Sequence, residues 1–354
     1  MSTTGHHGID VAIHDPHSQD DEFNAGLLYR PIHDRSMSRD RCFLCGKQAK
    51  GANRTAEHVF PQWLLRQYGL AQKRLTLLNG ESIEYGRLKI VCCPECNNIW
   101  LSRVEEKVKT AFERGVPGVN SLDRQVLFSW LAKIFYGILF KELSILFNQD
   151  DPTSGNIMPQ KYFEEFDMLH QLLQSIRFET EFVGAPPWSI FIVDCHVRND
   201  LEKDFDFFDS LGGLCLAIRI GPVGILACLE DNSSLQIAER RLYEKFEGHK
   251  FHWIQFKELF ARVVYLQKLL NRVPKYLVKL PDHKNPTLQI VSLPMQGLST
   301  KPVYDDWNHA DFAEAMAFCM HLPFEELFQA PDLVMTWFLD ESGNIREMGP
   351  DDPI

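Results

Sequence analysis

The sequence predicts an α+β fold in which a small metal-binding module precedes a larger region of mixed helices and strands. Two Cys-x-x-Cys pairs, Cys42 with Cys45 and Cys93 with Cys96, lie within one short part of the chain. Later stretches combine apolar residues at helical spacing with apolar runs that are typical of buried strands. We therefore expect a module over 36–118 and an α+β region over 119–354.

Length and composition describe an ordinary globular protein. The chain has 354 residues, of which 45% are hydrophobic and 24% are charged. Nine cysteines in a chain of this length do not form the disulfide framework of a small secreted domain. The N-terminus shows no secretory signal, and the most apolar helix candidate, 126–147, is interrupted by Lys133, Lys141 and Glu142. We expect a cytoplasmic protein without a membrane span.

The charge is unevenly distributed along the chain. The formal net charge is −11, yet between Pro31 and Gly115 we count 15 Lys and Arg residues against 9 Asp and Glu residues. A basic segment suits a nucleic-acid partner, because phosphate contacts dominate the affinity of such complexes. Short segments also vary this much without a functional reason, so the charge alone leaves both interpretations open.

The first 35 residues are rich in polar residues and glycine and predict a flexible leader. His6, His7, His14 and His17 are potential metal ligands in this leader. Their surroundings contain too few apolar residues to build a fixed site, and a poorly ordered segment is the expected state.

The module itself reads as short strands and helices around the cysteines. Ala56–Phe60 is a strand candidate, and Pro61 begins a helix that runs to Tyr68, since proline suits a first helical turn. The turn signal Asn79-Gly80 predicts a hairpin. The last two elements are a strand at Leu88–Val91 and a helix at Asn97–Glu113, which Gly115, Pro117 and Gly118 end.

Helices and buried strands alternate in the region that follows. The apolar face of Leu122–Phe147 predicts a core helix. The runs Leu214–Ile220 and Val223–Leu229 flank Gly221-Pro222 and predict a hairpin of buried strands. The other expected elements are strands at Trp188–Val193 and Val334–Leu339, and helices at Gln160–Phe178, Leu235–Phe246, Phe256–Asn271, Asp311–Met320 and Phe324–Gln329.

The two cysteine pairs predict one structural zinc site. A Cys-x-x-Cys pair turns both sulfurs toward a common point, and zinc accepts four thiolates in a tetrahedron. Cys92 competes with Cys93 for the fourth position, and the two-residue gap to Cys96 favours Cys93. The remaining cysteines lie in apolar runs and are expected to be buried without a role: Cys195, Cys215, Cys228 and Cys319.

The residues around these cysteines carry a further pattern. Glu57-His58 is followed by Pro61, and Asn97-Asn98 comes directly after Cys96. The order C-x-x-C, E-H-x-x-P, C-x-x-C-N-N resembles the HNH, or ββα-metal, endonucleases, in the subgroup that carries a structural zinc. The resemblance covers the module and implies a small ββα-metal domain.

The resemblance also implies roles for individual residues. His58 would be the general base, and Glu57 and Asn97 would hold a catalytic divalent ion such as Mg²⁺, with Asn98 as the ligand if the register differs by one. Glu57 stands where Asp is commoner in the family, and Asn79 is the nearest candidate for an asparagine that orients the base. Because neighbours on a regular strand point to opposite faces, we expect a bend at Glu57-His58.

The resemblance therefore implies a metal-dependent HNH endonuclease that hydrolyses phosphodiester bonds in DNA, with a role in bacterial defence. A second interpretation stays open, in which the zinc module is catalytically silent and binds nucleic acid or a protein partner, as the acidic net charge favours. The C-terminal region would restrain the enzyme, bind a regulatory protein or form a homo-oligomer. We recognise no catalytic motif in it.

Overall fold

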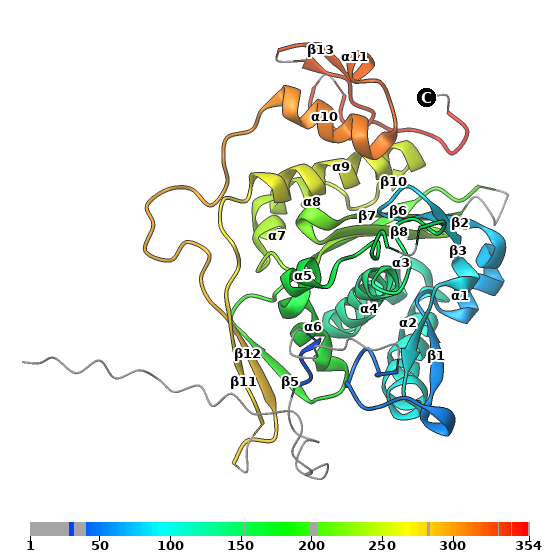
Figure 1. Ribbon diagram of the computed structural model, residues 1–354. Helices are drawn as coiled ribbons and strands as arrows, with labels where there is room; N and C mark the ends of the chain where they lie inside the picture. The colour runs from blue at the N-terminus through cyan, green and yellow to red at the C-terminus, as the bar shows by residue number, and fades with distance from the viewer. Residues whose placement is uncertain are drawn as a thin grey trace, which may run out of the picture.

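The computed structural model describes residues 28–31, 40–151, 153–198, 204–281, 284–331, 333–340 and 342–352. It is a mixed α+β protein with helices and several small sheets, as the sequence predicts (Figure 1). Most of the expected leader, with its four histidines, lies outside the described residues.

Two short antiparallel strands form the centre of the module. Strand β1 (Thr55–His58) pairs with β4 (Lys89–Cys92), so that Thr55 lies opposite Cys92 and His58 opposite Lys89. Glu57 is the buried residue of β1, and its neighbours on the strand are more exposed. The pairing is regular through His58, and the chain bends only after it, at residues 59–60. The bend that we expected between Glu57 and His58 is therefore absent.

The segment between β1 and β4 folds as the sequence predicts. Pro61 stands directly before helix α1 (Gln62–Gln67), where its missing N–H costs the helix nothing. The hairpin follows as β2 (Arg74–Thr76) and β3 (Ser82–Glu84), which are antiparallel. Gly80 adopts a φ of 81° in the turn, a conformation that glycine allows.

One continuous helical segment follows the second cysteine pair. It is π-helical over Cys96–Leu101 and continues as α2 (Ser102–Phe112). Gly115, with a φ of 66°, ends this segment as predicted. The chain then enters another short helix, α3 (Gly115–Asn120), where we expected only a break. Gly118 allows α3 to lie close to α2, because a Cβ at this position would collide with a backbone oxygen of α2.

Helix α4 (Arg124–Glu142) joins the module to the rest of the molecule. The Asp123 side chain caps its N-terminus by accepting a hydrogen bond from the Gln125 N–H at 2.7 Å. Residues 127–139 are buried on all sides, which identifies α4 as the core helix that the sequence predicts. At Gly137 the helix lies against Val59, with the Cβ position only 3.1 Å from a Val59 methyl group. Within the described ranges, no helix combines the length and apolar character needed to cross a membrane.

A five-stranded sheet lies at the centre of the C-terminal region. The strand order is β10-β6-β9-β8-β7, and every pair is antiparallel except β10 with β6. The predicted hairpin of buried strands is confirmed as β8 and β9, with Gly221 at a φ of 57° in the turn. The strand bounds are β6 (Ser189–Cys195), β7 (Phe205–Ser210), β8 (Cys215–Ile220), β9 (Val223–Cys228) and β10 (Lys250–Phe251).

Helices cover both faces of this sheet. Ile190 and Ile192 of β6 face the core that contains α4, while Phe191 and Val193 face a second core. The second core is covered by α9 (Trp253–Leu269) and α10 (His309–Met320), which lie on the opposite side of the sheet from α4 in Figure 1. The sheet is thus the middle layer of three.

The remaining elements lie around these layers. Gln160–Phe178, expected as one helix, is divided by turns into α5 (Gln160–Phe163) and α6 (Asp167–Leu173). A separate sheet has the order β11-β12-β5. The other bounds are β5 (Thr180–Val183), α7 (Ser234–Ala238), α8 (Arg240–Glu244), β11 (Tyr276–Lys279), β12 (Leu288–Ser292), α11 (Phe324–Leu327), β13 (Phe328–Ala330) and β14 (Leu333–Val334).

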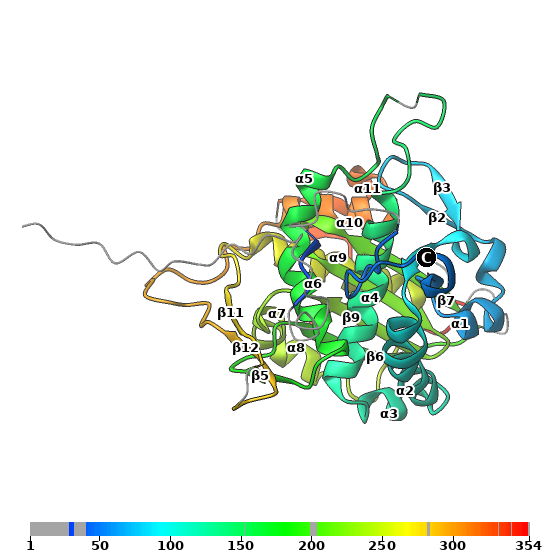
Figure 2. The same cartoon turned by 60° about the horizontal axis from the view of Figure 1, so that its bottom comes forward.

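The module shares its hydrophobic core with the rest of the chain. Cys42 and Val59 of the module belong to the same buried cluster as Trp130 of α4 and Ile225 of β9. Figure 2 shows the module helices beside α4 and the sheet. The boundary near residue 118 stays a prediction, and the core runs across it.

Candidate functional site

The four cysteines of the two pairs come together, as the sequence predicts. The sulfur atoms of Cys42, Cys45, Cys93 and Cys96 all lie within 4.8 Å of one another. The sulfurs of Cys45 and Cys93 are 3.6 Å apart. Tetrahedral zinc with Zn–S bonds of about 2.3 Å places its sulfurs about 3.8 Å apart. The donor set and its spacing therefore fit a metal ion such as zinc.

Backbone hydrogen bonds shape both cysteine turns. In the first, the Gly46 N–H donates to the Cys42 carbonyl at 2.9 Å, and Gly46 adopts a φ of 70°. The Phe43 N–H donates to the Val91 carbonyl at 3.0 Å, which attaches this turn to β4. In the second, the Cys96 N–H lies 3.5 Å from the Cys93 sulfur. Each turn thus presents its sulfurs to the common point.

Cys92 is a fifth thiol next to the cluster. Its sulfur lies 3.7 Å from the Cys42 sulfur. The sulfurs that lie within 4.8 Å of one another are those of Cys42, Cys45, Cys93 and Cys96, and Cys92 is not among them. The set with Cys93 is therefore the one we retain.

Helix α6 and the turn that follows it, which begins at Gln174, hold the first cysteine turn from outside the module. His170 Nε2 lies 2.9 Å from the Phe43 carbonyl oxygen, and Gln174 Nε2 donates to the Leu44 carbonyl at 2.8 Å. Since a carbonyl oxygen only accepts, the His170 contact requires a proton on Nε2. Both side chains are fully buried, and burial lowers the pKa of His170 to about 4. His170 is therefore neutral at pH 7 and serves as a fixed donor.

His58 lies at the end of β1 and is partly exposed. Its Nδ1 is 3.3 Å from Gln62 Nε2, and Arg66 Nη2 donates to Gln62 Oε1 at 2.9 Å. The Arg66 contact fixes the amide orientation, so Gln62 donates to His58 and Nδ1 is the unprotonated, basic nitrogen. Burial, followed by the charges of Lys89 and Lys133, lowers the pKa of His58. A neutral imidazole that can accept a proton is the form a general base requires.

Glu57 is bound to a buried lysine from α4. Lys133 Nζ lies 2.5 Å from Glu57 Oε1 and 2.9 Å from Glu105 Oε1 of α2. The same ammonium donates to the carbonyl oxygens of His58 at 2.6 Å and Val59 at 3.1 Å. The side chain of Lys133 is only 1% exposed.

The charges of this group balance each other inside the protein. Burial by itself lowers the pKa of the Lys133 ammonium, but the Glu105 and Glu57 carboxylates outweigh it and hold that pKa above its usual value. Burial also raises the pKa of the Glu57 carboxyl, and the Lys133 charge opposes this effect. Lys133 thus supplies Glu57 with a fixed cation that belongs to the chain itself.

The two asparagines lie in the first turns of the helical segment, directly after Cys96. Asn97 Nδ2 donates to Thr55 Oγ1 at 2.9 Å, and Thr55 Oγ1 donates to the Cys92 carbonyl at 2.9 Å. Asn98 is exposed. Thr55 and Glu57 are two residues apart on a regular strand and share one face. Asn97 therefore approaches the face of β1 that carries Glu57.

Two contributors to this site were missed by sequence reasoning. In the sequence, Lys133 argues only against a membrane span, and nothing there assigns Glu105 a role. The available signal was a lysine in the middle of an otherwise apolar helix, since a lysine is rarely buried without a charged partner. The partner itself could not be identified, because Glu57 lies far away in the sequence.

No family model, curated protein or solved structure matches this chain. The candidate site therefore rests on its own geometry and chemistry.

Proposed function

We propose that the protein is a metal-dependent endonuclease of the HNH type that hydrolyses phosphodiester bonds in DNA. The supporting observation is the arrangement around β1 and β4. His58 lies at one end of the strand pair, the four cysteines lie at the other, and the helical segment that carries Asn97 follows directly. A partly exposed, neutral His58 suits base-assisted attack of water on a phosphodiester.

Each residue has a defined part in this proposal. The single lone pair of His58 Nδ1 accepts from Gln62 Nε2 in this structure, so Gln62 must move aside before Nδ1 can accept the proton of the attacking water. Glu57, with Asn97 or Asn98, would hold an oxygen-liganded ion such as Mg²⁺, which stabilises negative charge on the phosphate and the leaving oxygen. The zinc held by the cysteines is structural. Because Glu57 Oε1 already contacts Lys133, Glu57 must share its carboxylate between two cations.

The Glu57–Lys133 contact also favours a second candidate function. If Lys133 is the permanent counter-charge of Glu57, no divalent ion is needed there. The module would then be a catalytically silent zinc module that binds nucleic acid or a protein partner. This candidate predicts one zinc per chain and no hydrolysis with any divalent ion.

Plasmid cleavage distinguishes the two candidates. Purified protein is incubated with supercoiled plasmid in Mg²⁺, Mn²⁺ or Ni²⁺, beside His58→Ala and a control, His309→Ala, whose histidine lies at the start of α10. Zinc content is measured for each protein. The nuclease predicts metal-dependent nicking that is lost in His58→Ala and kept in His309→Ala, with zinc unchanged.

Two other outcomes would contradict parts of the nuclease proposal. Undiminished cleavage by His58→Ala would eliminate His58 as the base. No cleavage by any of the proteins, with one zinc per chain, would support the silent module.

A further inference from the structure

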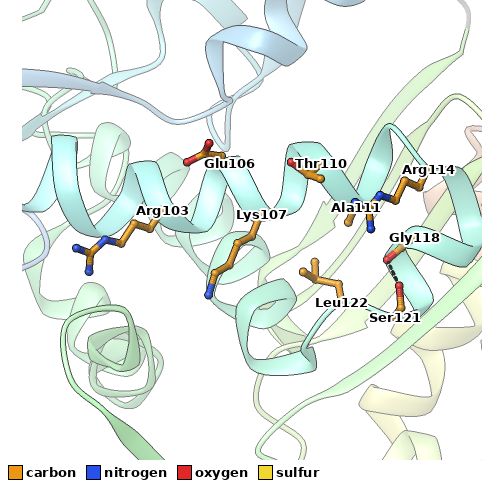
Figure 3. A pocket seen from close by; sticks show the side chains of 9 residues that line it. All are labelled: Arg103, Glu106, Lys107, Thr110, Ala111, Arg114, Gly118, Ser121 and Leu122. Atoms are coloured by element: carbon orange, nitrogen blue, oxygen red, sulfur yellow. Dashed lines mark hydrogen bonds between the residues drawn. The ribbon is translucent and has the colours of Figure 1, made fainter.

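Helices α2 and α3 enclose an open groove of about 340 Å³ on the surface of the module. Arg103 and Lys107 of α2 line one part of it, and Arg114, between the two helices, lines another. Figure 3 shows the Arg103 and Lys107 side chains leaving α2 on the same side. The groove is therefore bordered by three basic side chains.

Helical spacing explains why these charges gather. Arg103 and Lys107 are four residues apart, which places them one above the other on the helix. From Arg103 to the end of α2 at Phe112 the rise is roughly 14 Å at about 1.5 Å per residue, and Arg114 lies two residues further on. One strand of B-DNA carries a phosphate every 3.4 Å or so along its axis, so this length matches several successive phosphates.

The basic groups of the groove are available to an external anion. Among the residues that the structure describes, no ion pair involves Arg103, Lys107 or Arg114; Arg103 lies over the Trp100 ring at 5.3 Å. By contrast, Lys109 on another side of α2 pairs with Glu113 at 3.7 Å. Unpaired surface cations attract phosphates more strongly than cations already neutralised by a carboxylate.

The rest of the lining agrees with a phosphate ligand. Thr110 contributes a hydroxyl group that can donate to a phosphate oxygen. The Ser121 hydroxyl already donates to the Gly118 carbonyl at 2.9 Å (Figure 3). Gly118 also lines the groove, and a Cβ at this position would collide with the Ala111 carbonyl oxygen of α2. Glu106 is the one carboxylate in the lining, and in Figure 3 it leaves α2 on the other side from Lys107.

The groove lies away from the candidate catalytic residues. Glu105 points from α2 to Lys133, and Arg103 and Lys107 are each two residues from it, about half a turn around the helix. A ligand in the groove therefore lies on the far side of α2 from Glu57. It would contact a segment of nucleic acid that flanks the cleaved bond.

We infer that the α2–α3 groove is a binding site for the phosphate backbone of nucleic acid. The module supplies the positive charge for this contact in a chain whose net charge is −11. The site anchors nucleic acid outside the reacting centre. That the groove assists cleavage rests on the proposed nuclease function. That the groove binds nucleic acid does not.

Fluorescence anisotropy with a labelled DNA duplex tests the groove without catalysis. Zinc-loaded full-length protein is titrated without added divalent ions, so that no cleavage interferes. The variants are the triple substitution R103Q/K107Q/R114Q, the matched control Lys109→Gln and the opposite change Glu106→Gln. Zinc content and thermal unfolding confirm that each variant is folded.

The expected result is a loss of at least about tenfold in affinity for the triple variant, with the slope of log K against log salt shallower by up to about 0.9 per lost phosphate contact. Lys109→Gln binds like the unmodified chain, and Glu106→Gln binds more tightly. In a cleavage assay the triple variant raises KM and leaves kcat nearly unchanged.

Three results would overturn the inference. The first is a folded triple variant that binds DNA like the unmodified chain, whether or not the protein cleaves DNA. The second is the absence of DNA binding by the unmodified chain. The third is equal competition by polyglutamate at matched charge, which would indicate an acidic protein partner instead. Binding that depends on the groove together with absent cleavage would retain the groove and reject the nuclease.

Discussion

Replacing Lys133 with methionine removes the cation that joins α4, β1 and α2. Methionine is close to lysine in length and shape, so the change leaves no large cavity and isolates the loss of charge and hydrogen bonds. The Glu57 carboxylate, whose side chain is 8% exposed, loses its counter-charge. The carbonyl oxygens of His58 and Val59 lose a donor.

The expected cost follows from these contacts. Breaking a buried ion pair by removing one partner costs about 3–5 kcal/mol. An orphaned buried carbonyl costs about 1–3 kcal/mol, although β1 can relax toward water at its exposed end and recover part of this. Glu105 adds little, because at 24% exposure its carboxylate can turn to solvent. We therefore expect a loss of about 3–5 kcal/mol, a large share of the 5–15 kcal/mol that stabilises a typical domain.

Urea unfolding of the zinc-loaded protein measures this cost. The set comprises Lys133→Met, Glu57→Gln, the double variant and the exposed control Lys109→Met, which should change stability by less than about 0.5 kcal/mol. Removing both charges leaves no buried ion without a partner, so the double variant should be more stable than Lys133→Met alone. Two results would refute the reasoning: a double variant whose loss of stability equals the sum of the two single losses, or a Lys133→Met variant whose stability is within about 0.5 kcal/mol of the unmodified chain.

Three further predictions follow from contacts around the site. Gln174→Leu leaves the Leu44 carbonyl without its donor, so it should cost about 1–3 kcal/mol and speed zinc loss to a chelator. Gln171→Leu, three residues earlier in α6, should leave zinc loss unchanged. The pKa of His170 is about 4 in the folded protein and about 6.5 in the unfolded chain. Its contribution to stability is therefore complete above pH 6.5 and is lost as the pH falls toward 4, on the order of 3 kcal/mol. In urea titrations at several pH values, His170→Gln should flatten this dependence of stability on pH, and an unchanged dependence would reject the role of His170. Gln62→Leu removes the donor that occupies the Nδ1 lone pair of His58. It should raise the single-turnover cleavage rate by up to about tenfold with zinc content unchanged, and a slower rate would mean that Gln62 is needed to orient the base.

Local patterns in the sequence were sufficient for much of the module. Pro61 and Asn79-Gly80 act through their own backbone preferences, and the helix and hairpin that they predict are present. The two cysteine pairs predict their own cluster, since each turn directs two sulfurs and one metal can satisfy both.

Tertiary contacts determine the elements and ion pairs that local sequence patterns did not predict. Strand β7 carries three phenylalanines among acidic residues, and it is a strand because β8 offers it a paired edge. The short helix α3 forms because Gly118 allows it to pack closely on α2. Helix propensities of single residues do not include such a contact. The Glu57–Lys133 contact spans 76 positions of the chain, too far for any local pattern to reveal.

The contacts of α6 and the turn that follows it with the first cysteine turn have a consequence for the order of events during synthesis. Gln174 follows Leu44 by 130 positions. At about 5–20 residues per second, a ribosome needs roughly 7–26 s to translate that interval. During this time the first turn has emerged while its outer support has not, and its thiols are open to oxidation or to the wrong metal. Early zinc delivery, or a chaperone that shields the nascent thiols, would therefore raise the yield of correctly loaded protein.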